Sequence, residues 1–187
     1  MKTRLIFVML TVAVIPVLFF TSCSKIKDLA SVDVNYNVPR VSFVYTPATL
    51  KGSGTEVVLY EGHVHVNVDS LLSANGISTG TIGRATFNAV SITIQSPDTA
   101  NFGWLQSARV VISSSGTFNS PVVIGTVTNS NPLAKTIIFV MNNTNIQPYF
   151  GSTGFYLRIY AVLNGTVPYN WIGMYLDSQM TLHLEAI

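Results

Sequence analysis

The chain contains few charged residues and only one cysteine. Charged side chains make up 10% of its 187 residues, whereas typical soluble domains contain about 25%. No cluster of Lys and Arg suggests a nucleic-acid surface, and no block of like charges indicates a disordered tail. A chain with one cysteine forms no internal disulfide, so the fold must depend on its apolar core.

Motifs of common catalytic sites are also missing from the sequence. It contains no Gly-x-Ser-x-Gly nucleophile turn and no phosphate-binding loop. Asp98, Asp177 and Glu185 are isolated along the chain, so a glycosidase-like pair of carboxylates could arise only through folding. We therefore expect no enzymatic activity and no cofactor.

The first 22 residues have the organisation of a secretory signal. Lys2 and Arg4 are followed by the sixteen uncharged residues 5–20 and then by the small residues 21–22. A membrane-spanning helix needs about 20 apolar residues, and this run is shorter and contains Pro16. The segment is therefore interpreted as a signal peptide.

The segment Phe20-Thr21-Ser22-Cys23 resembles the lipobox of bacterial lipoproteins, with Phe where the pattern prefers Leu. The resemblance implies cleavage before Cys23 and a diacylglycerol on its thiol, which would anchor the chain in the bacterial cell envelope. Ser24, in place of the Asp that favours inner-membrane retention, favours the outer membrane. Either leaflet of that membrane could carry the lipid-anchored protein. Simple secretion and a retained membrane anchor are the alternatives to lipidation.

Cleavage would leave 165 residues without net formal charge, because the eight remaining Lys and Arg equal the eight Asp and Glu. This length suits one domain. We expect a signal peptide over residues 1–22, a lipidated tether over 23–32 and one domain over 33–187.

Alternation of apolar and polar residues dominates the expected domain, and no long amphipathic helix is visible. Short helical or irregular inserts are expected at 69–76, 96–104 and 142–151. The intervening segments give eight or nine strands. The sequence therefore predicts a single two-sheet antiparallel β-sandwich, either jelly-roll or immunoglobulin-like.

Two segments depart from simple alternation. Pro39 interrupts the first strand region, which favours an edge strand or a bend. The apolar run at 137–141 lacks alternation, which predicts burial on both faces.

His63, His65 and His183 are the candidate metal ligands. His63 and His65 are two residues apart on a predicted strand and point to the same side. If the strand of His183 lay beside them, the three imidazoles could bind Zn²⁺. However, Val64 and Val66 occupy the opposite side, so the histidines fit the solvated face of an amphipathic strand. We therefore expect no metal site.

Aromatic residues near predicted loops are the candidate ligand-binding groups. These are Trp104, Tyr149, Tyr169 and Trp171. Their rings offer a large apolar area together with a polar group, which suits stacking on sugars or on a protein partner. Rings that instead attach the inserts to the core explain the same pattern.

Three functions remain open from the sequence. The first is a non-enzymatic, lipid-anchored envelope protein that binds a partner or contributes to a surface assembly. The second is a carbohydrate-binding module of a glycan-uptake system, which predicts an exposed patch of the four aromatic residues. The third is a metal-binding protein or metal-dependent enzyme that uses His63, His65 and His183. No nucleic-acid partner is expected.

Overall fold

The computed structural model describes residues 31–47, 52–151 and 153–187, so Cys23 and the signal segment lie outside the described residues. None of the described helices is long and apolar enough to span a membrane. The strands are β1 (Ser31–Tyr45), β2 (Glu56–His65), β3 (Gly80–Ser96), β4 (Leu105–Ser113), β5 (Val122–Thr128), β6 (Thr136–Ile138), β7 (Val140–Met141), β8 (Gly154–Leu163) and β9 (Ile172–Ala186). The short helices are α3 (Val68–Ala74), η1 (Phe102–Trp104) and η2 (Gln147–Tyr149).

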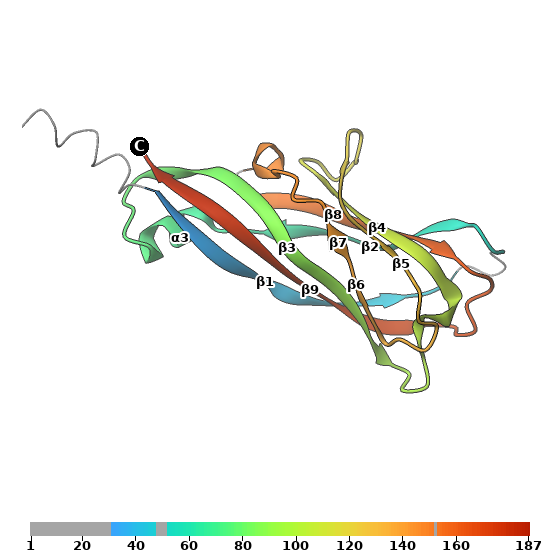
Figure 1. The fold of residues 1–187 in the computed structure, drawn as a ribbon. Helices are drawn as coiled ribbons and strands as arrows, with labels where there is room; N and C mark the ends of the chain where they lie inside the picture. The colour runs from blue at the N-terminus through green and yellow to red at the C-terminus, as the bar shows by residue number, and fades with distance from the viewer. Residues whose placement is uncertain (1–30, 48–51, 152) are drawn as a thin grey trace, which may run out of the picture.

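The strands form two antiparallel sheets that face each other (Figure 1). The first sheet has the order β1-β9-β3-β6 and the second has the order β2-β8-β4-β5-β7. The pairings are nested, because β1 pairs with β9, β2 with β8, β3 with β6 and β4 with β5. This nesting is that of a jelly roll. The predicted β-sandwich is confirmed, and the strand order selects the jelly-roll alternative.

The core lies between the sheets and comes mainly from their most regular strands. Alternate residues of β8, from Phe155 to Leu163, are 0–1% exposed. The ring of Phe155 packs edge-on against Phe87 of β3, with the ring centres 5.8 Å apart. Each fully buried side chain of this size contributes about 1.5–3 kcal/mol. The apolar residues of the alternating pattern are therefore the ones whose packing holds the two sheets together.

β1 lies at an edge of the first sheet and contains a bulge at Pro39. The register shifts between Val38 and Val41, so that Pro39 and Arg40 face the single residue Asp177 of β9. A bulge at an edge tolerates the missing N–H of proline. The prediction that Pro39 marks an edge strand or a bend is confirmed.

The apolar run at 137–141 is not buried on both faces, so that prediction is wrong. Ile137 and Phe139 are 4% and 3% exposed, whereas Ile138 and Val140 are 67% and 73% exposed. β6 pairs with β3 in the first sheet, and β7 pairs with β5 in the second. The segment thus crosses between two sheet edges, and every second side chain points to solvent.

The sandwich has two distinct ends. At one end β1 begins, with Ser31 beside Glu185, and the C-terminal residue Ile187 bonds to Thr79 (Figure 1). We call this the N-terminal end. β1 therefore begins inside the segment expected as a tether. At the other, distal end, Tyr45 pairs with Ile172. The 17 residues of β3 span about 55 Å between these ends at about 3.3 Å per residue.

Candidate functional site

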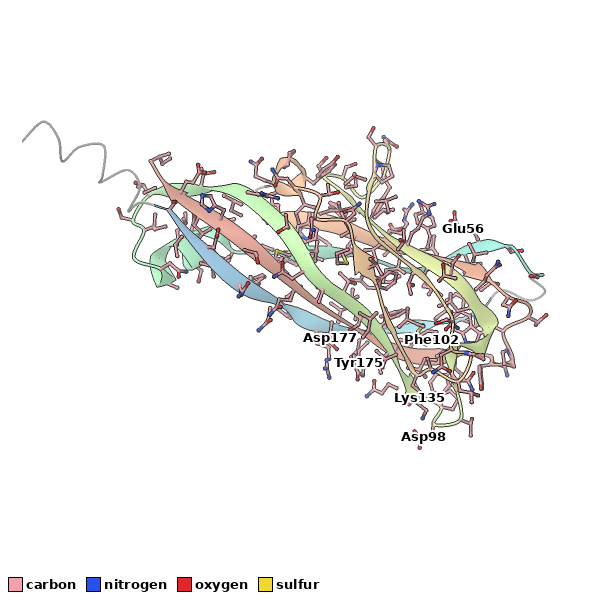
Figure 2. The ribbon with its side chains drawn as sticks, viewed as in Figure 1. Glu56, Asp98, Phe102, Lys135, Tyr175 and Asp177 are labelled. Carbon is pink, nitrogen blue, oxygen red and sulfur yellow. The ribbon has the colours of Figure 1, made fainter. Side chains whose placement is uncertain are left out.

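The distal end is built from connecting segments that bond to one another. The Tyr169 hydroxyl donates to the carbonyl oxygen of Thr99 at 3.1 Å. The Lys135 ammonium donates to the carbonyl oxygen of Asp98 at 2.5 Å. Figure 2 shows Asp98 and Lys135 together at this end, away from the C-terminus. These hydrogen bonds join connecting segments that are far apart in sequence, so the segments at the distal end are held to one another.

Trp104 belongs to the core of the distal end. Its side chain is 4% exposed and stacks on Tyr45, with ring centres 5.9 Å apart and planes 20° from parallel. Within the described part of the chain, its indole Nε1 has no hydrogen-bond partner. A buried ring in this position cannot stack on a surface ligand, so the structure places Trp104 among the packing residues.

The other three aromatic candidates are spread over the molecule. The backbone N–H of Ile146 donates to the carbonyl oxygen of Ala85 at 2.8 Å, which places Tyr149 toward the N-terminal end. Tyr169 is partly buried against the core of the distal end. Trp171 is half exposed there. The four residues therefore form no common exposed row.

One exposed apolar patch lies at the distal end of the first sheet. Val44, which is 63% exposed, pairs with Gly173 of β9. A Cβ on Gly173 would lie 3.6 Å from the Trp171 ring, so that ring lies beside the glycine. We call Val44, Trp171 and Gly173 the distal patch. Neither Val44 nor Gly173 carries a sequence signal for this role, because the patch forms only when β1 and β9 pair.

Polar side chains cover the middle of the outer face of the first sheet. Thr181 of β9 lies between Asn35 and Asn88, with donor–acceptor distances of 3.0 and 2.8 Å. Gln179 donates to Asn37 at 2.9 Å. A depression of about 220 Å³ lies beside these two amides, which is below the roughly 300 Å³ of the smallest usual ligand pockets. These side-chain hydrogen bonds therefore link neighbouring strands on the sheet surface and do not form a ligand pocket.

The outer face of the second sheet carries a column of cations and aromatic rings. Tyr160 lies between two guanidinium groups, with Arg109 4.2 Å and Arg158 5.5 Å from its ring centre. Phe118 covers Arg158 at 3.9 Å and has a φ of 50°. A positive φ is strained for a bulky residue, and the cation–π contact offsets part of that cost. Arg158 also pairs with Glu61 at 2.6 Å.

The three histidines occupy two different sheets. His63 and His65 lie on β2, and His183 lies on β9, so the strands that carry them are not neighbours. His183 contacts Asp33 at 2.7 Å and Glu185 at 3.5 Å. The described residues contain no group of three or more His, Cys, Asp or Glu side chains placed to hold a metal ion. A site made from all three histidines is therefore not formed.

His63 and His65 lie side by side, with ring centres 4.3 Å apart. Partial burial of the ring lowers the pKa of His63 from its ordinary value, and the charge of nearby His65 lowers it further. His65 also lines an open cavity of about 460 Å³ together with Asp69 and Thr153. His63 is therefore protonated less readily than an isolated imidazole.

The acids considered for catalysis are widely separated. Asp98 is exposed at the distal end, Asp177 lies in the middle of β9 and bonds to Arg40, and Glu185 lies at the N-terminal end. Because these three carboxylates are spread along the long axis, no two of them flank a common substrate position.

No protein-family model matches the sequence, and no curated protein matches it. Among solved structures, the chain is similar to one of Desmodium yellow mottle tymovirus, with 15% identity over 84% of this chain and 90% of that one, at a TM-score of 0.31. A structure of the infectious bursal disease virus Gt strain matches with 9% identity over 82% of this chain and 33% of that one, at a TM-score of 0.38. At these TM-scores the similarity supports no function.

Proposed function

We propose that this chain is a non-enzymatic, lipid-anchored protein of the bacterial cell envelope that presents its distal end to a protein partner or a surface assembly. The anchor is the lipid expected on Cys23, and the outer membrane is the expected location. The β-sandwich is the part that binds.

The separation of the two ends is the observation that carries the proposal. The chain enters the sandwich at Ser31, at the N-terminal end, and the distal patch lies at the other end of the long strands. A lipid attached eight residues before Ser31 would thus leave the distal patch facing away from the membrane. Exposed Trp is enriched among residues that dominate binding energy at protein interfaces.

Partner capture by the distal patch gives a direct test. We expect Trp171→Ala to lower the recovery of a specific envelope partner at least about tenfold, because a Trp anchor in an interface is worth about 2 kcal/mol or more. The variant should still fold and unfold cooperatively, since half of Trp171 is exposed to solvent. The measurement is quantitative co-purification from detergent-solubilised membranes with the full chain as bait.

Ile138→Ala provides the matched control. Ile138 is also apolar and is 67% exposed, but it lies on the edge strand β6 and not at the distal end. The substitution should leave recovery unchanged. Equal recovery with Trp171→Ala and wild type would remove the distal patch from the proposal. A glycan that co-purifies instead of a protein would favour the carbohydrate-binding alternative.

A further inference from the structure

Two imidazoles on the outer face of the second sheet have no assigned role. Val64, which separates the two histidines in the sequence, is buried. His63 and His65 therefore both project outward from β2. Among the described residues, neither the His63 ring nor the His65 ring forms a hydrogen bond with another side chain. A neutral imidazole nevertheless offers one donor and one acceptor nitrogen. The pair is therefore held together by the strand and not by a hydrogen-bond network.

The spacing of the two rings fits a chelate. Metal–nitrogen bonds to histidine are about 2.0 Å long, so two imidazoles on neighbouring coordination positions of one ion have ring centres roughly 4.5 Å apart. The observed ring centres are 4.3 Å apart, and the planes are 70° from parallel. Tyr156 of β8, opposite His63 in register, contacts that imidazole at 4.7 Å between ring centres and limits its movement.

We propose that His63 and His65 form a two-imidazole chelate for Cu²⁺. Imidazole is a preferred ligand of late divalent metals, and Cu²⁺ binds most tightly among them at a given nitrogen site. This proposal is independent of the envelope function, and it revises the sequence-based expectation of no metal site.

The remaining coordination positions of the ion would be open. Glu61, the nearest acid on the same side of β2, is already paired with Arg158. The cavity of about 460 Å³ beside His65 has room for water or a small ligand. The chelate is therefore an exchangeable surface site, unlike a closed structural zinc site with four protein ligands.

The test is a titration of the full chain with Cu²⁺ in detergent, followed by calorimetry and pulsed electron paramagnetic resonance. The wild-type protein should bind one equivalent with the signal of two imidazoles. His63→Ala and His65→Ala should each weaken binding at least about tenfold and leave the signal of one imidazole. The double variant should lose this equivalent.

His183→Ala is the matched control, because His183 is also an outward-facing histidine but lies on the first sheet. It should leave the affinity and the signal unchanged. Circular dichroism melts check that all variants fold. The proposal is overturned if the double variant binds Cu²⁺ as the wild type does, or if His183→Ala causes the same loss.

Discussion

Cys23→Ser should release the protein from the membrane or leave it as an uncleaved precursor. The reason is that a single acyl chain gives only marginal binding and two chains give stable anchoring, since each buried methylene contributes about 0.8 kcal/mol. None of the described helices would replace the lipid as a membrane span. The measurement is membrane fractionation with a carbonate wash, together with metabolic labelling by palmitate.

Ser24→Ala is the control for this experiment, because it changes the neighbouring residue and keeps the thiol. It should be processed, labelled and membrane-bound as the wild type is. A Cys23→Ser protein that is still cleaved, unlabelled and resistant to the carbonate wash would rule out lipid anchoring. The described part of the fold begins at Ser31, so the variant should fold normally.

Gly154→Ala should destabilise the sandwich more than any other glycine substitution that we consider. Gly154 has a φ of +128°, and a Cβ there would overlap the backbone carbonyl oxygen of Val64. That oxygen belongs to β2, which is fixed by its pairing with β8, so it cannot move away cheaply. We expect a loss of at least about 3 kcal/mol in the free energy of unfolding and a fall of roughly 10 °C in the melting temperature.

Gly165→Ala separates backbone strain from the clash. Gly165 has a φ of +153°, but nothing lies within 4 Å of the position that a Cβ would take there. The substitution should therefore cost only the strain, about 1–2 kcal/mol. Chemical denaturation of both variants measures the difference. Similar losses for the two would show that the approach of β2 to Gly154 contributes nothing.

Much of the strand content could be predicted from the sequence, because one face of most strands packs in the core and the other face lies toward water. β8 and β9 alternate between buried and partly buried residues over nearly their whole length, and this alternation is visible in the sequence. The order of strands in the sheets could not be predicted, because local alternation does not say which strands pair. The segment at 137–141 misled for the same reason, since its alternate exposure depends on two different sheet edges.

The candidate site was harder to predict than the fold. An aromatic residue beside a turn has the same sequence signature whether it packs inward, as Trp104 does, or outward, as Trp171 does. The contact of Trp171 with Gly173 depends on the local path of the chain, and that of Val44 depends on strand register. The side-by-side placement of His63 and His65 was accessible, because a separation of two residues on a strand determines it.

The bulges in the outermost strands have a consequence for crowding. Anchoring by lipid would confine many copies to a plane with their long axes aligned, which is the geometry in which open sheet edges join from chain to chain. β1 is interrupted by Pro39, β2 has a register shift between Val58 and Tyr60, and β6 and β7 have three and two residues. No described edge therefore offers a long regular template to a neighbouring copy. Copies packed densely on a membrane should stay separate, and any assembly should form through side chains rather than by extending a sheet.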